Sequence, residues 1–228
     1  MVMIMKINAH LIIAVSISIL LFISGCSWFK SEDREMEKSA KELATEGSLE
    51  FREENYRKAI KSFTTLRDWY PFSQYAILAE LKIADSYYKL EEYEEARASY
   101  EQFENLHPEN EAVPYVIYRT GLCWYNRIET VDKDQTPAKK AMEQFQRLVT
   151  KFPSDPYSPY AVKKIKRCKD SLANHEEYVA NFYLKGKKYE AALKRFEEIF
   201  ALYPDTEAGK RSLENIAICR KILEEKKS

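Results

Sequence analysis

The sequence predicts an all-α protein built as a solenoid of helical hairpins. A spacing of alanine, large apolar residues and a closing proline recurs four times, with twelve residues from the alanine to the proline. The copies run from Ala59 to Pro71, Ala96 to Pro108, Ala141 to Pro153 and Ala192 to Pro204. In each copy the apolar residues fall on one helical face, which must pack on another helix. The composition agrees, because the 228 residues include 5 glycines and no run of alternating β-branched residues.

Net charge and cysteine usage narrow the class of function. The formal net charge is +0, which gives no general attraction to polyanions such as nucleic acid. Apart from Cys26, the cysteines are odd in number and widely spaced, at Cys123, Cys168 and Cys219. Such spacing is typical neither of a disulfide framework nor of a zinc site. We therefore expect no metal, no cofactor and no nucleic-acid partner.

The amino terminus resembles an export and lipid-anchoring signal. Lys6 precedes an apolar segment, residues 11–23, which has the length of a signal-peptide core and is short for a membrane span. The following Ser-Gly-Cys26 resembles the end of the bacterial lipobox. That resemblance implies removal of a lipoprotein signal peptide, residues 1–25, and acyl chains on Cys26 that hold the chain on a membrane. A plain signal peptide with an incidental cysteine is the alternative.

The segment after this cysteine, residues 26–37, is polar and charged. We expect it to be a lipidated flexible tether between the membrane and the folded part. By resemblance to the enteric sorting rule, Ser27 after the cysteine favours the outer membrane.

The first two units follow the period closely. The first is predicted to hold one helix around Gly47 and a second from Tyr56, joined by a tight turn. The second, Ser73 to His107, is the cleanest copy, and its Ala84 lies twelve residues before Ala96. This layout of helix, turn, helix and proline, with small residues where the helices cross, resembles the tetratricopeptide (TPR) repeat. The resemblance implies a right-handed superhelix, in which we expect about ten helices.

The third unit departs from the period by eight residues. Gly121 lies twenty rather than twelve residues before Ala141, so the extra residues fall at 128–135. Thr136 followed by Pro137 is typical of a helix N-cap and first position, which places the insertion in the loop between two helices. Inserted loops on solenoids often contact partners, and a tolerated surface insertion is the alternative.

A second departure follows the third unit, where an additional helix is predicted from Tyr157 to Leu172. It is either continuous with the first helix of the last unit or kinked into it. A final helix, Glu207 to Lys226, is expected to cover the end of the stack. We assign residues 38–153 to amino-terminal units with a substrate groove and residues 154–228 to carboxyl-terminal units for partner docking.

The additional helix carries a run of cations that has two interpretations. They are Lys163, Lys164, Lys166, Arg167 and Lys169. Carboxylates follow closely at Asp170, Glu176 and Glu177, which favours a solvated face over a basic binding patch.

No catalytic constellation is present in the sequence. After the signal segment the histidines are His107 and His175, which lie far apart, and no HExxH, GxSxG, Walker or GxGxxG pattern occurs. Clustered carboxylates such as Glu94 and Glu95 fall at helix starts, where they complement the helix dipole. The sequence therefore predicts a binding protein. The alternative is an enzyme whose active site has no recognised sequence pattern.

In a solenoid of this kind the first helices of the hairpins line a concave groove. The peptide-binding candidates on these helices offer aromatic faces and cations: Phe51, Arg52, Tyr88, Lys89, Tyr118 and Tyr125. Aromatic residues at helical spacing are more often core. For Tyr88 and Tyr125 the groove and the core are equally supported.

The order of these features is similar to that of one family, BamD (ComL), the TPR lipoproteins of the outer-membrane β-barrel assembly machinery. The similarity rests on the lipobox at Cys26, a Y-P-F-S turn at Tyr70–Ser73, an insertion ending D-Q-T-P-A, a long helix after F-P-S-D-P-Y-S-P-Y-A, and a closing Y-P-D-T at Tyr203–Thr206. It covers nearly the whole chain.

This resemblance implies a non-enzymatic outer-membrane lipoprotein, lipid-anchored on the periplasmic face in a Gram-negative bacterium. Its partners would be the barrel insertase BamA, unfolded outer-membrane proteins and other assembly lipoproteins. The amino-terminal repeats would receive carboxyl-terminal segments of substrates, and the carboxyl-terminal repeats would hold the insertase. Lys194 and Arg195 are the candidate docking residues, as exposed cations. The alternative is a TPR lipoprotein scaffold for cell-envelope or peptidoglycan enzymes.

Overall fold

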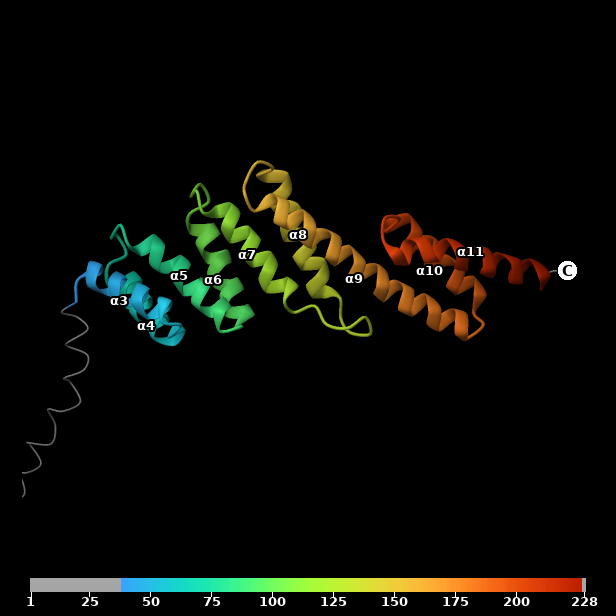
Figure 1. Ribbon diagram of the computed structural model, residues 1–228, viewed down its shortest axis with the longest axis horizontal. Coiled ribbons are helices and arrows are strands. Elements are labelled where there is room, and N and C mark those ends of the chain that lie inside the picture. Colours follow the sequence, from blue (N-terminus) through green and yellow to red (C-terminus); the bar gives the residue numbers. More distant parts are fainter. Residues whose placement is uncertain (1–37, 227–228) are drawn as a thin grey trace, which may run out of the picture.

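The computed structural model describes residues 38–226, and within this range it contains nine α-helices and no strand (Figure 1). They are α3 (Ala40–Arg52), α4 (Tyr56–Trp69), α5 (Ala76–Lys89), α6 (Tyr93–Leu106), α7 (Val113–Tyr125), α8 (Thr136–Lys151), α9 (Ser158–Lys185), α10 (Tyr189–Leu202) and α11 (Glu207–Glu225). Successive helices pack on each other in an elongated row, and α11 also contacts α9. The predicted all-α solenoid is confirmed. The signal peptide, Cys26 and the tether lie outside the described residues.

The core is built from one buried triad that occurs in four helices. In α4, α6, α8 and α10, an alanine is followed at i+4 by an aromatic ring and at i+7 by a large apolar residue, which places all three on one face. Each member is at most 1 % exposed: Ala59, Phe63, Leu66, Ala96, Tyr100, Phe103, Ala141, Phe145, Leu148, Ala192, Phe196 and Ile199. The repeat seen in the sequence is therefore the core of the fold.

Glycines in two of the facing helices let a phenylalanine ring lie against the helix backbone. A β-carbon added at Gly47 would come within 2.9 Å of the Phe63 ring, and one at Gly121 within 2.6 Å of the Phe145 ring. Carbon atoms in contact normally stay about 3.5 Å apart, so neither position accepts a larger residue without movement. Phe63 follows Gly47 by sixteen residues and Phe145 follows Gly121 by twenty-four. The same contact forms in spite of the insertion.

The turns inside three hairpins share an unusual backbone conformation. Glu54, Glu91 and Lys187 have φ angles of 63°, 61° and 56°, in the left-handed region that favours glycine. Each lies five residues before the alanine of its hairpin's triad. A non-glycine residue in this region costs about 1 kcal/mol. The packing of the two helices must therefore hold each turn in place.

The insertion forms the loop between α7 and α8, as predicted, and this loop is anchored to α9. Gln135 is 5 % exposed; its Nε2 donates a hydrogen bond to the Thr130 carbonyl at 3.2 Å, and its Oε1 accepts one from Ser171 Oγ at 3.0 Å. His175 Nδ1 lies 2.6 Å from the Val131 carbonyl oxygen. The loop is thus held at two points, which favours a structural role over that of a free arm.

The start of α8 and the end of the stack differ in detail from expectation. Thr136, predicted as the N-cap of α8, is its first helical residue, and the buried Gln135 takes the cap position.

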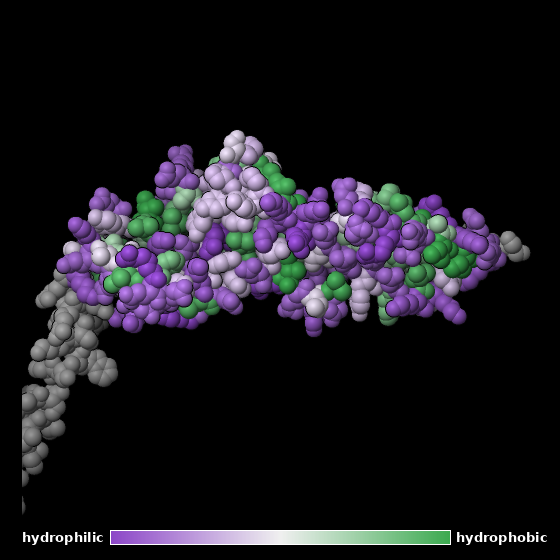
Figure 2. All heavy atoms as spheres, in the orientation of Figure 1, coloured by the Kyte–Doolittle hydropathy of each residue, from purple (hydrophilic) through white to green (hydrophobic). Residues whose placement is uncertain are grey.

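The final helix α11 buries Ile216 but leaves Leu213 and Ile218 exposed, so it covers the end of the stack only on one side. Figure 2 shows a mainly hydrophilic surface along the solenoid, with a hydrophobic area over α11.

The additional helix and the first helix of the last unit form one continuous helix. α9 runs for 28 residues, from Ser158 to Lys185, and is the longest helix of the described chain (Figure 1). It packs against α8, which precedes it in the chain, and against α10 and α11, which follow it. Of the two alternatives left by the sequence, the structure shows the continuous helix.

Replacing Gly121 with alanine is expected to lower the free energy of unfolding by about 1–3 kcal/mol, because the new methyl group meets the Phe145 ring. Urea unfolding of the mature chain measures this loss. Adding Phe145→Leu removes the obstructing ring, so the double variant should lose less than the sum of the two single losses. Additive losses would show that the methyl group and the ring do not meet.

Candidate functional site

Three of the six groove candidates lie along the first helices of the second and third hairpins. Tyr88 belongs to α5, and Tyr118 and Tyr125 belong to α7. All three side chains are half-buried and pack partly on the core cluster that contains Phe145. These tyrosines are therefore core on one side and surface on the other.

The other three candidates have different surroundings. The Phe51 ring lies against Tyr56, with 5.4 Å between ring centres, and Lys82 Nζ lies 4.5 Å from the centre of the Phe51 ring. Arg52 and Lys89 are exposed cations in the last turns of α3 and α5. A cation at this place stabilises the helix dipole, which accounts for both residues without a ligand.

Arg119 of α7 joins the rings of the second and third hairpins. Its guanidinium carbon lies 3.6 Å from the centre of the Tyr88 ring, and its Nε donates a hydrogen bond to the Tyr100 hydroxyl at 2.9 Å. The side chain is 16 % exposed. Asn126 Nδ2 donates a hydrogen bond to the Tyr88 hydroxyl at 2.8 Å, which fixes the far end of that ring. A partly desolvated cation–π contact contributes about 1–2 kcal/mol, so Arg119 ties α5 to α7.

Asp85 of α5 is the buried counter-charge of this cluster. It is 8 % exposed and accepts hydrogen bonds from the hydroxyls of Tyr100, at 2.6 Å, and Tyr115. Arg119 Nη2 lies 3.9 Å and Lys82 Nζ 3.4 Å from its oxygens. Burial and the Asp85 charge raise the pKa of both tyrosines, which therefore remain neutral donors. A carboxylate matched in this way joins α5 to Tyr100 of α6 and Tyr115 of α7 and stabilises the fold.

Further tyrosine rings continue the cluster from α7 to α9. Tyr118 stacks on Tyr157, the residue before α9, with 5.3 Å between ring centres and 25° between ring planes. Lys164 Nζ lies 3.8 Å from the centre of the Tyr125 ring. Tyr160, one turn before Lys164, is 57 % exposed. The cluster therefore combines one exposed ring, Tyr160, with half-buried rings and a lysine, a combination that suits an aromatic ligand side chain.

We name this surface the aromatic–cation face. It consists of Tyr88, Tyr118, Arg119, Tyr125, Tyr157, Tyr160 and Lys164. The sequence did not single out Arg119, Tyr157 or Tyr160 as site residues, and it gave Lys164 only as part of the run of cations on the additional helix. Arg119 follows the predicted site residue Tyr118 directly in the sequence, so it could have been predicted as a site residue. Tyr157 could not, because it joins the face only through the contact between the start of α9 and α7.

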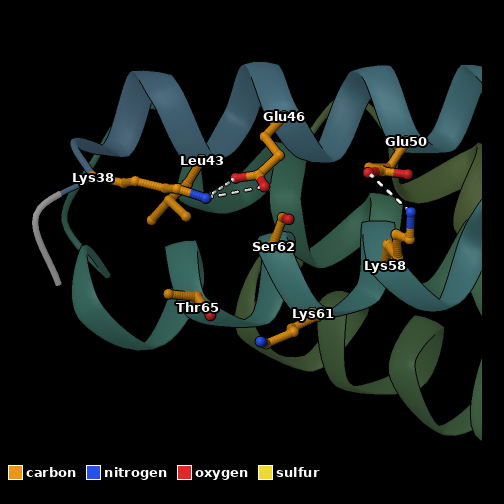
Figure 3. Close-up of a pocket in the computed structure, with 8 residues that line it drawn as sticks. All are labelled: Lys38, Leu43, Glu46, Glu50, Lys58, Lys61, Ser62 and Thr65. Atoms are coloured by element: carbon orange, nitrogen blue, oxygen red, sulfur yellow. Dashed lines mark hydrogen bonds and ion pairs between the residues drawn. The ribbon is translucent and has the colours of Figure 1, made fainter. Parts of the chain in front are cut away.

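A separate cavity of about 240 Å³ lies between α3 and α4 (Figure 3). Lys38 Nζ donates to both oxygens of Glu46, at 3.0 and 2.8 Å, and Lys58 Nζ lies 3.8 Å from Glu50. The cavity's carboxylates are thus paired with lysines of its own lining. Its lining is polar apart from Leu43, so it lacks the aromatic surface that suits an unfolded peptide.

The two docking candidates on α10 differ from each other. Lys194 is an exposed cation, as expected. Arg195 is half-buried: its Nη1 donates to Glu176 Oε2 of α9 at 2.9 Å, and its guanidinium carbon lies 5.5 Å from the centre of the Tyr183 ring. Arg195 therefore holds α10 to α9 and presents only part of its guanidinium group to solvent.

The reactive groups of the described chain are in unreactive settings. Burial raises the pKa of the Cys123 and Cys168 thiols to about 12, so neither is a nucleophile at neutral pH. Residues 38–226 hold no group of three or more histidine, cysteine, aspartate or glutamate side chains arranged to bind a metal ion. In the same range, no helix combines the length and apolar character that crossing a membrane requires.

Comparison with known proteins places this architecture in a family. The family model described as "YfiO: Outer membrane lipoprotein" matches residues 36–228. The chain is 32% identical to outer membrane protein assembly factor BamD of Rickettsia prowazekii, over 82% of this chain and 74% of that protein. It is 30% identical to BamD of Vibrio cholerae, over 86% of this chain and 84% of that protein. It is 28% identical to BamD of Neisseria gonorrhoeae, over 93% of this chain and 85% of that protein. The chain belongs to the BamD (YfiO) family of outer membrane lipoproteins.

Proposed function

We propose that the chain is a non-enzymatic scaffold of an outer-membrane β-barrel assembly complex, anchored by lipid on Cys26 to the periplasmic face of the outer membrane. The observation that carries the proposal is the alignment with relatives named outer membrane protein assembly factor BamD, which spans 74–85% of their length. A solenoid suits this role, because it exposes a large extended surface for its length. The covalent lipid is the one non-protein group we assign.

The aromatic–cation face is the proposed site for unfolded outer-membrane proteins. Its rings are held in place by Arg119 and by packing on Phe145, so they need little ordering when a ligand binds. Segments of unfolded chain offer the aromatic and aliphatic side chains that such rings accept. Phe51, Arg52 and Lys89 remain candidates for a longer ligand that extends along the concave side.

Docking of a BamA-like insertase is assigned to α10, at Lys194 and Arg195. Lys194 offers a free cation, and Arg195 keeps part of its guanidinium group in solvent. Other assembly lipoproteins complete the set of proposed partners. The rival function is a scaffold for cell-envelope or peptidoglycan enzymes. Copurification of the native lipoprotein separates the two, because a barrel insertase is recovered in one case and peptidoglycan enzymes in the other.

Replacing Cys26 with serine should abolish labelling of the chain by palmitate and leave its signal peptide uncleaved, because the thiol is the acylated group. The variant should migrate as a larger form and be lost from the outer-membrane fraction. Metabolic labelling and membrane fractionation measure both effects. A Cys26→Ser chain of normal size that still carries label would exclude Cys26 as the anchor.

Tyr160→Ala should weaken the binding of a carboxyl-terminal outer-membrane-protein peptide roughly fivefold, because one aromatic contact contributes about 0.5–1.5 kcal/mol. Tyr178→Ala is the matched control, since both tyrosines are exposed on α9, by 57% and 53%. Fluorescence anisotropy of a labelled peptide measures the affinity. Equal effects of the two substitutions would remove Tyr160 from the binding site.

Arg195→Glu should reduce recovery of the insertase in pull-downs at least tenfold, because it reverses a charge at the proposed contact. The control is the exchange of charges, Arg195→Glu with Glu176→Arg, which restores the internal ion pair but not the arginine at position 195. Capture that stays low in the exchanged variant supports a direct contact. Capture restored by the exchange would mean that Arg195 acts only by holding α10 to α9.

A further inference from the structure

The amino-terminal part of α9 carries a stripe of cations beside the aromatic–cation face. Tyr160, Lys163, Lys164 and Arg167 are spaced i, i+3, i+4 and i+7, so their side chains share one side of the helix. An adjacent side of the helix, with Ala161, Cys168 and Leu172, is buried in the core. We name Lys163, Lys164 and Arg167 the basic stripe.

The cations of the basic stripe are not balanced by carboxylates of this chain. Lys163 and Arg167 are exposed, and within residues 38–226 neither has a carboxylate oxygen within 4.0 Å. Asp170 lies one turn further along α9 and is not ion-paired with Arg167. Lys164 faces the Tyr125 ring and no carboxylate.

The carboxylates of Glu176 and Glu177, which follow in the sequence, do not neutralise the basic stripe, although its Lys163 and Arg167 are exposed to solvent as expected of a solvated face. Glu176 accepts a hydrogen bond from Arg195 of α10 at 2.9 Å. Glu177 accepts two from Arg211 of α11, at 2.7 and 2.5 Å. Both acidic groups thus stabilise the carboxyl-terminal helices. The positive charge of the basic stripe is therefore not neutralised by these two carboxylates.

The basic stripe is continuous with the aromatic–cation face. Lys164 belongs to both, because its Nζ lies 3.8 Å from the centre of the Tyr125 ring. Lys163 Nζ lies 5.9 Å from the centre of the exposed Tyr160 ring. From Tyr160 to Arg167 the helix rises about 10 Å, which an extended peptide spans in about three residues. One peptide can therefore touch an aromatic ring and a cation of the stripe at once.

We propose that the basic stripe selects acidic segments of unfolded polypeptide. An aromatic side chain of the segment packs on Tyr160 and its neighbours, and carboxylates within about three residues of it pair with Lys163 and Arg167. Lys164 adds to the attraction from the edge of the aromatic–cation face. The inference rests on the proposed function and adds to it a preference for the charge of the bound segment.

The test compares three labelled peptides that share one aromatic residue and differ only in the two residues beside it. These two residues are Asp and Glu in the acidic peptide, Asn and Gln in the neutral peptide, and two Lys in the lysine peptide. Anisotropy titrations use the mature chain, residues 26–228, at low and at high salt. The acidic peptide should bind about fivefold more tightly than the neutral one at low salt, and the difference should shrink at high salt. The lysine peptide should bind most weakly.

The double variant Lys163→Gln with Arg167→Gln should remove the preference and leave the affinity for the neutral peptide unchanged. Lys185→Gln with Lys221→Gln is the matched control, because it removes two exposed cations away from the basic stripe and should keep the preference. Equal affinities of the acidic and neutral peptides for the unmodified chain would overturn the inference while leaving the proposed function in place. Absence of binding by all three peptides would overturn both.

A membrane surface is the other anionic partner that the test must separate. The same variants are measured with phosphatidylglycerol vesicles and with phosphatidylcholine vesicles. The inference expects no difference between the Lys163→Gln with Arg167→Gln variant and the control in either. Loss of phosphatidylglycerol binding in that variant, with the peptide preference intact, would assign the stripe to lipid and overturn the inference.

Discussion

The contact of an aromatic ring with the backbone of a facing helix is the constraint on which this solenoid depends. Phe63 against Gly47 and Phe145 against Gly121 bring two helices closer than side chains of ordinary size allow. In these two hairpins the contact buries one side of α3 and one side of α7. It also holds the left-handed turn of the first hairpin, at Glu54, whose conformation is unfavourable by itself. The half-buried tyrosines of α5 and α7 belong to the candidate site.

In the proposed binding site, the residues that would meet a ligand also hold the fold together. Arg119 bonds to Tyr100 and lies over Tyr88, and Asp85 supplies the buried negative charge that such a cation requires. The network joins α5 to α7 and at the same time fixes the orientation of the outer rings. A ligand therefore meets a surface whose side chains have already lost much of their conformational freedom. Tyr88 packs on the core and keeps part of its side chain exposed, so its core role is visible and its groove role stays a prediction.

The fold could be predicted because its signals are local in sequence. The triad spacing, the eight extra residues before Ala141 and the glycines at helix crossings each follow from helical periodicity. The site was predicted less completely, because its geometry depends on contacts between distant residues. The stacking of Tyr118 on Tyr157 and the hydrogen bond from Ser171 to Gln135 join different helices and loops. No short-range pattern encodes such contacts.

The ion pairs of α9 also could not be predicted from the sequence, because they join residues of different helices. Glu176 and Glu177 follow the lysines of α9 closely in the sequence. In the structure, however, their carboxylates bind arginines of α10 and α11. A sequence gives the number of charges on a helix. It does not give the direction in which each side chain leaves the helix, and that direction decides whether a face is neutral or charged.

The length of α9 sets a fixed separation within the molecule. Its 28 residues correspond to about 42 Å, and the sixteen residues between Tyr160 and Glu176 correspond to about 24 Å. No proline or glycine interrupts it after Pro159. α9 therefore acts as a rigid spacer, which fixes the distance between the proposed aromatic–cation face at its start and the contact of Glu176 with α10.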